Sequence, residues 1–428
     1  MVGLDEWMLR LGHLKVVCSA GIQSGAGRRR IKQKATEILT ETLPWSDGPT
    51  GALAVYLKRK KLAPELRDES GQFRYPDLGL VEQDGAWDLV SLSKADSGPT
   101  PGVTRQDHWF SQEGLRSRTG AISVGGRHGS KTGLDHVLDW AEMTGLMSRS
   151  GQILPPGLLL ARHRPLCLDL APHCNPYRFG PEWIIPGFLL IEADIDVFGR
   201  FTRALSTVEE PITKKTGARA FARAVLDLAD EAEEDRSLTS GQRYAIAGVL
   251  RDLQRSVRRT RAQDEETLGA AATTWHRASS RLETYADLGI LEKARAEQDF
   301  SYEYRYLRTP VFRSLLNSLE NATDTQQWLE GDLFPAITGK EEGDQAISDD
   351  MLREELPALA STIGRPTMPL PIETVALWMV VRGIEEGLGT SISAARDALR
   401  RVARSDSAFI RLSRGSYGER EEFISLRP

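Results

Sequence analysis

The sequence has few cysteines and no long apolar run. Its 428 residues include three cysteines, too few for a disulfide framework and suited to a reducing cytosol. No stretch approaches the roughly eighteen apolar residues that a membrane-spanning helix needs. The longest apolar segment, Trp183 to Ile191, is interrupted by Pro186 and Gly187. The first residues are acidic rather than basic, unlike a signal peptide. These absences predict a cytoplasmic protein with no membrane partner.

The net charge is too small for its sign alone to indicate what kind of partner the protein binds. The net charge is −5, which argues against DNA wrapping the whole surface, whereas phosphate binding depends on the local field. Basic residues gather in short clusters, and acidic ones gather between them, from Asp230 to Asp235 and from Asp349 to Glu355. Hydrophobic content of 40% and charged content of 27% are those of an ordinary globular protein, long enough for three or four units.

One local pattern occurs twice with matching spacing. A glycine falls seven residues after a leucine in an amphipathic helical stretch, from Leu138 to Gly145 and from Leu282 to Gly289. Two apolar residues follow each glycine, and then a hairpin. Glycine can adopt the left-handed conformation that ends a helix, so the pattern predicts a helix, a stop and a short strand.

This pattern resembles the last helix and wing of the winged helix-turn-helix superfamily. Weaker copies lie near the N-terminus and in the C-terminal segment, where a helix from Ile392 to Arg404 precedes strands at 409–412 and 422–426. The resemblance covers about half of the chain and rests on pattern, without a diagnostic residue string. It implies a mainly α fold with small β-hairpins (α+β), built from tandem winged-helix modules joined by helical and proline-rich segments.

The expected organisation has seven parts. They are an N-terminal segment (1–27), module 1 (28–98), module 2 (103–165), a proline- and aromatic-rich connecting region (166–235), a helical pair with module 3 (236–337), an acidic and proline-rich linker (338–371) and module 4 (372–428).

Several finer elements follow from spacing. Apolar residues recur at intervals of three and four in 242–263 and in 269–287, which predicts two core-facing helices paired antiparallel. The second strand of the module 2 wing is expected at Leu158. Thr309 and Pro310 predict a helix start, because threonine caps and proline suits the first turn. A helix that follows a wing can mediate either homodimer formation or packing between domains, and the sequence does not distinguish these roles.

Two motifs with possible cofactor chemistry are incomplete. The glycine-rich loop 125–132 lacks the adjacent Gly-Lys-Ser/Thr of a nucleotide-binding loop. His163, Cys167, His173 and Cys174 lack the paired spacing of structural zinc sites. We therefore expect no cofactor and no bound metal.

One acidic triplet raises the alternative of a metal-dependent nuclease. Glu192, Asp194 and Asp196 alternate, and on a strand they would share one face. No lysine partner or second carboxylate set follows, so the sequence favours a protein without catalytic residues.

The sequence thus predicts a non-enzymatic protein that binds double-stranded DNA mainly through phosphates, with the helices before the wings in or across the major groove. Four modules suit a DNA-clamping or targeting subunit of a larger prokaryotic assembly, in antiviral defence or a mobile element, with other protein subunits as partners. A protein–protein scaffold is the main alternative. The residues expected to contact DNA are Arg28, Arg29, Arg30, Lys58, Arg59, Lys60, Lys61, Lys131, Arg396, Arg400, Arg401 and Arg414.

Overall fold

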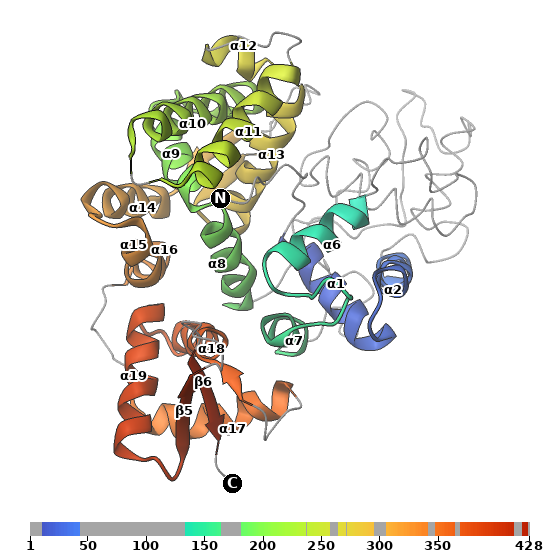
Figure 1. Ribbon diagram of the computed structural model, residues 1–428, viewed down its shortest axis with the longest axis vertical. Helices are drawn as coiled ribbons and strands as arrows, with labels where there is room; N and C mark the ends of the chain where they lie inside the picture. Colours follow the sequence, from blue (N-terminus) through green and yellow to red (C-terminus); the bar gives the residue numbers. More distant parts are fainter. Residues whose placement is uncertain are drawn as a thin grey trace, which may run out of the picture.

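Helices dominate the structure. The computed structural model describes residues 11–42, 133–163, 181–236, 238–256, 264–270, 272–294, 305–340, 347–363, 369–414 and 422–426. Sixteen α-helices lie in these ranges and, with one 3-10 turn, make up 73% of them, beside two three-stranded antiparallel sheets (Figure 1). The expected fold class, mainly α with small β-hairpins, is confirmed. Within the same ranges no helix has the length and apolar character to cross a bilayer.

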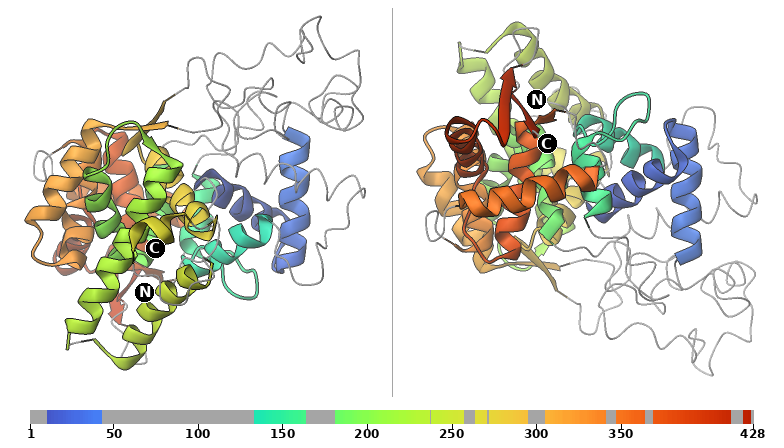
Figure 2. Two further views of the ribbon diagram at one scale, coloured as in Figure 1. Left: turned by 90° about the horizontal axis from the view of Figure 1, so that it is seen from above. Right: turned by 90° about the horizontal axis from the view of Figure 1, so that it is seen from below.

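The N-terminal group consists of four helices that meet on α1. They are α1 (Leu11–Ser24), α2 (Arg28–Thr42), α6 (Gly133–Met143) and α7 (Pro155–Arg162). Figure 2 shows α2 beside α1 at one edge of the molecule. Gly145 has a φ of +69° after α6, and the chain turns back through a bridge between Met147 and Ile153. The predicted stop and hairpin after α6 are therefore confirmed.

The expected second wing strand at Leu158 is wrong. Two prolines occupy the first turn of α7, and Leu158, Leu159 and Leu160 are all buried inside that helix. Proline fixes a backbone angle that suits a helix start, and three consecutive leucines can all be buried when a helix is enclosed by its neighbours.

The middle unit contains the first sheet. Its elements are α9 (Ile195–Ser206), β1 (Ile212–Thr213), α10 (Lys214–Glu234), α11 (Ser240–Ser256), α12 (Glu265–Gly269), α13 (Ala272–Asp287), β2 (Leu291–Ala294) and β3 (Arg305–Arg308). The strand order is β1-β3-β2, so the last strand of the hairpin lies in the centre. The expected helices are present, but α13 makes its main packing contact with α10 rather than with α11.

The C-terminal unit repeats this order of elements. It contains α17 (Asp349–Ile363), β4 (Leu370–Pro371), α18 (Ile372–Glu385), α19 (Ile392–Ser405), β5 (Ile410–Arg414) and β6 (Glu422–Leu426). Its strand order, β4-β6-β5, again places the last strand in the centre. In both units the chain runs through a helix, a very short strand, further helices and a hairpin.

Three short helices connect the two sheet-containing units. They are α14 (Pro310–Asn321), α15 (Thr325–Gly331) and α16 (Leu333–Thr338). The Thr309 side chain accepts a hydrogen bond from the backbone N–H of Phe312, which confirms the predicted helix start. α14 packs on α9, and α15 packs on α19, so this segment lies between the units.

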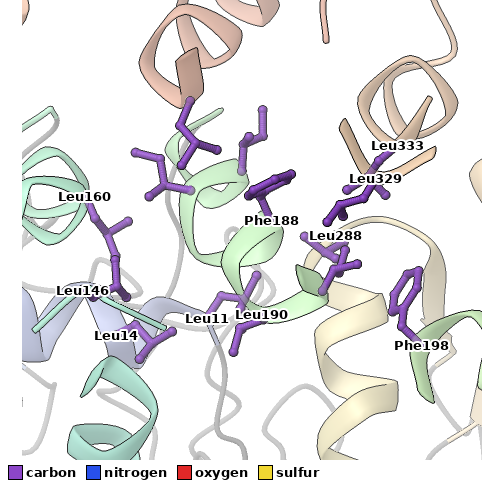
Figure 3. Packing of buried hydrophobic residues seen from close by; sticks show 14 of the residues in the cluster. Leu11, Leu14, Leu146, Leu160, Phe188, Leu190, Phe198, Leu288, Leu329 and Leu333 are labelled. Atoms are coloured by element: carbon purple, nitrogen blue, oxygen red, sulfur yellow. The ribbon is translucent and has the colours of Figure 1, made fainter. Parts of the chain in front are cut away.

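α8 (Ile184–Ala193), which follows a 3-10 turn (Pro181–Trp183), occupies the centre of the molecule. Figure 3 shows its Phe188 and Leu190 between leucines of the N-terminal group, such as Leu11, and leucines of the middle segments, such as Leu288. A helix that is apolar on all sides is stable only when it is buried on all sides. The longest apolar segment of the sequence is thus the common core of the units.

Polar contacts fix the N-terminal group against the rest of the chain. The Lys15 ammonium donates to the Glu182 carboxylate at 2.6 Å, and both side chains are buried. His163, at the end of α7, lies 3.0 Å from Glu385 of α18 and packs edge-on against Trp378. Because a buried ionic pair is stable only in one geometry, these contacts restrict how the helices can dock.

Gly289 provides a direct test of the helix stop. Its φ is +71°, its N–H donates to Ala286, and no atom lies within 4 Å of an added Cβ. We expect Gly289→Ala to lower the free energy of unfolding by about 1 kcal/mol, because only the left-handed backbone opposes the methyl group. Gly199→Ala, in the interior of α9 with ordinary van der Waals space, is the matched control and should be neutral or stabilising. Urea unfolding of both variants measures the difference; equal stabilities would contradict this explanation.

Candidate nucleic-acid interface

The residues predicted to contact DNA fall into three sets. Lys58, Arg59, Lys60, Lys61 and Lys131 lie outside the described residues, and the side chain of Arg414 does too, although its backbone is in β5. Arg28, Arg29 and Arg30 lie in the first turn of α2. Arg396, Arg400 and Arg401 lie on α19.

Arg28 is part of the packing between two helices. Its guanidinium forms ion pairs with Asp139 and Glu142 of α6, the second at 2.8 Å, and two-thirds of its side chain is covered. A phosphate would have to displace both carboxylates. Arg28 therefore holds α2 against α6 in this structure.

Arg29 and Arg30 are exposed beside a hairpin turn. Neither has an ion pair within the described part of the chain. The turn approaches the start of α2 so closely that a Cβ on Gly151, whose φ is +83°, would lie 2.7 Å from the backbone nitrogen of Gly27. Arg149, in the same turn, is 95% exposed, and its Nε forms an ion pair with Glu142 at 3.4 Å. We call Arg29, Arg30 and Arg149 the α2 patch.

Arg149 was missed from the sequence, although a signal was present. A basic residue in the sequence Ser148-Arg149-Ser150-Gly151 stands at the tip of a predicted hairpin, where a side chain is free of the core. Only the tertiary structure places that tip against the first turn of α2.

The predicted arginines of α19 are ion-paired. Arg396 contacts Glu330 at 2.8 Å and Glu373 at 2.9 Å. Arg400 contacts Glu422 of β6 at 2.8 Å and Asp397 at 3.4 Å, and Arg401 contacts Asp349 of α17 at 2.9 Å. Carboxylates from four neighbouring elements and from α19 itself thus neutralise much of its basic face.

Two further arginines of the C-terminal unit are exposed. Arg404 continues the row of Arg396 and Arg400 at intervals of four, and its Nε donates to the backbone oxygen of Arg400. Arg411 follows the buried Ile410 on β5, so it points to the opposite face of the strand. No ion pair of either residue occurs within the described ranges. We call Arg404 and Arg411 the α19 tip.

A polar cluster lies inside the middle unit. The Arg281 guanidinium bonds to Asp194 at 2.6 Å and stacks 4.5 Å from the centre of the Phe221 ring. The hydroxyls of Tyr285 and Thr202 lie 2.7 Å apart. Burial raises the pKa of the Asp194 carboxyl to about 6 and outweighs the opposing effect of Arg281. These groups lie among packed helices, where they fix the position of α13.

The carboxylate strand expected at Glu192, Asp194 and Asp196 is wrong. Glu192 is on α8, Asp194 is the residue between α8 and α9, and Asp196 is in the first turn of α9. Side chains two apart on a helix do not share a face, so the three carboxylates do not converge. Among the described residues no group of three His, Cys, Asp or Glu side chains has the arrangement of a metal site.

Comparison of the chain with protein-family models, curated proteins and solved structures finds no match.

Proposed function

We propose that this protein binds duplex DNA, and that the middle and C-terminal units are winged-helix modules. The observation that carries the proposal is the order of elements shared by the two units. Each has a short strand after its first helix, and each hairpin returns so that the last strand pairs with that short strand. The last helix and hairpin of each unit are the part for which the sequence resembles a winged helix-turn-helix module.

The contacts with DNA come from arginines that keep their charge exposed. The α2 patch presents Arg29, Arg30 and Arg149 from a helix and a turn that touch each other. The α19 tip presents Arg404 and Arg411. Guanidinium groups bind phosphate oxygens in a planar, two-pronged geometry, and their positions fix the orientation of a duplex.

The ion-paired arginines are expected to contribute less to DNA affinity than the sequence alone implies. Arg28, Arg396 and Arg400 already have carboxylate partners, so binding a phosphate there exchanges one anion for another. The net gain from such an exchange is small in water-exposed positions. In the α2 patch and the α19 tip, Arg29, Arg30, Arg404 and Arg411 have no ion pair among the described residues, so they gain most from a phosphate.

A protein scaffold is a second candidate, because the middle unit also exposes a surface of the opposite sign. Asp230, Glu231, Glu233 and Glu234 are exposed at the end of α10. Tyr244 on the adjacent α11 is 70% exposed, with the Arg251 guanidinium 4.7 Å from the centre of its ring. This surface suits a protein partner rather than a polyphosphate, and it agrees with the proposal that the chain acts as one subunit of a larger assembly.

The dependence of DNA affinity on salt tests the proposal. Binding of a fluorescent duplex is measured by anisotropy between about 50 and 200 mM salt; five phosphate contacts predict a slope of log K against log salt of about −4 to −5. Affinity that is absent at low salt, or unchanged across the range, would contradict DNA binding and favour the scaffold. A duplex and an acidic polypeptide of equal charge, compared in the same assay, separate DNA binding from attraction to any polyanion.

A further inference from the structure

The helix before the hairpin of the middle unit is enclosed by its own unit. Along α13 the side chains of Thr274, Arg277–Ser280 and Leu282–Tyr285 are buried, and Trp275 is 37% exposed. α10 packs along it, and Tyr285 reaches α9. A helix must expose a face to enter a groove about 12 Å wide. From Arg277 to Tyr285, α13 has no such face.

The N-terminal half of α19 is covered by α15. The Ser393 hydroxyl donates to the backbone oxygen of Glu330 at 3.2 Å, and Arg396 bonds to the carboxylate of the same residue. α15 is itself held in place, because Trp328 and Leu329 are fully buried and the Trp328 indole donates to Ser318. Base-reading side chains belong to the N-terminal part of a recognition helix, and here Ser393 and Arg396 of that part contact α15, whereas its exposed side chain, Asp397, is acidic and repels phosphates.

The C-terminal half of α19 is open. Arg404 and Arg411 are exposed, and the ion pair of Arg401 with Asp349 leaves both side chains about half exposed. Such an exposed pair contributes little stability, so a phosphate can replace the carboxylate at small cost. The surface of this unit that is available to DNA therefore consists of separate arginine side chains, near the end of α19 and on β5.

We infer that the C-terminal unit holds duplex DNA by its sugar–phosphate backbone, through Arg404 and Arg411, and does not read the bases. The inference rests on the proposed DNA binding. It specifies the mode of binding by this unit, which is contact independent of the DNA sequence. The reason is geometric, since the N-terminal half of α19 is the segment of this unit that would enter a groove, and α15 contacts it through Ser393 and Arg396.

The double variant Arg404→Ala, Arg411→Ala tests the inference on three labelled duplexes, one rich in A·T, one rich in G·C and one mixed. Each lost phosphate contact should weaken binding about fivefold near physiological salt, roughly 25-fold for the pair, and should reduce the salt slope by about two. The factor should be the same for all three duplexes, because a phosphate contact carries no sequence information. Arg313→Ala, an exposed arginine on α14 without an ion pair in the described ranges, is the matched control and should leave binding unchanged.

The outcomes are separable. A loss that differs by more than about tenfold between duplexes means that bases are contacted, which overturns the inference and leaves DNA binding intact. An equal affinity of double variant and wild type also overturns it. If the wild type binds none of the duplexes, the proposed function itself fails. Both arginines are exposed, so the unfolding temperature of the double variant should equal that of the wild type. If it is lower, the two single variants are measured instead.

Discussion

Arg281→Met is expected to lower the free energy of unfolding by about 3 kcal/mol at about pH 8, and by much less at about pH 5. Arg281 is the cation bonded to Asp194, and both side chains are about nine-tenths buried. Methionine keeps an unbranched side chain over the Phe221 ring but removes the charge. At the higher pH the Asp194 carboxylate would remain buried without a partner, which is the costly state.

The pH dependence follows from the direction of the pKa shift. The folded-state pKa of Asp194 is about 6, above the ordinary value of 3.8, so the folded state binds more protons between the two values. This group therefore stabilises the fold most when it is protonated, and that contribution is lost as the pH rises from about 4 to about 6. Arg281 lowers this pKa, so in the methionine variant the pKa lies higher and the carboxyl is neutral at about pH 5.

Urea unfolding of wild type and variant at the two pH values measures the effect. The control is Asp194→Asn added to Arg281→Met, which replaces the carboxyl by a neutral amide of similar shape and should recover most of the loss at the higher pH. A penalty that is the same at both pH values, or one that the second substitution does not relieve, would show that lost packing rather than an unpaired charge is responsible.

Replacing Arg29, Arg30 and Arg149 together by alanine is expected to weaken duplex binding about a hundredfold near physiological salt. Three phosphate contacts at about fivefold each give this factor, and the salt slope should fall by about three. All three side chains are largely exposed, so the fold should be unaffected. Anisotropy at several salt concentrations measures both quantities.

The matched control replaces exposed arginines elsewhere. Arg223 on α10 and Arg313 on α14 are exposed, and their double alanine variant lowers the net charge without touching the α2 patch. Binding should then change by no more than about threefold, the general effect of charge. If the control weakens binding as much as the triple variant, attraction to the whole surface rather than the α2 patch accounts for DNA affinity.

Features determined by a few neighbouring residues could be predicted from the sequence. Gly145 and Gly289 end helices because the left-handed backbone is easy only for glycine. Thr309 starts α14 because its hydroxyl reaches an N–H three residues ahead. The C-terminal hairpin and the helix before it were likewise visible, since alternating and three-to-four spacings are local. None of these depends on a distant part of the chain.

Where two local patterns competed, packing decided. The alternation of Glu192, Asp194 and Asp196 fits a strand, yet burial of nearly all of Ile184–Ile191 favours the helix α8, and Asp194 lies at the junction with α9. Leu158–Leu160 fit a strand in the same way and are helical because the core surrounds α7. A short apolar run does not specify its conformation, because the neighbours that bury it come from elsewhere.

The charge of the candidate interface was the property least accessible to sequence. The basic row on α19 was evident, but its partners come from positions as distant as Glu330, Asp349 and Glu422. Arg149 joined Arg29 and Arg30 only through the contact of a turn with the start of α2. The sequence by itself determined which residues carry charge and which segments are helical. The tertiary structure decided which charges are neutralised and which helix faces are covered, because both depend on groups that approach only when the chain folds.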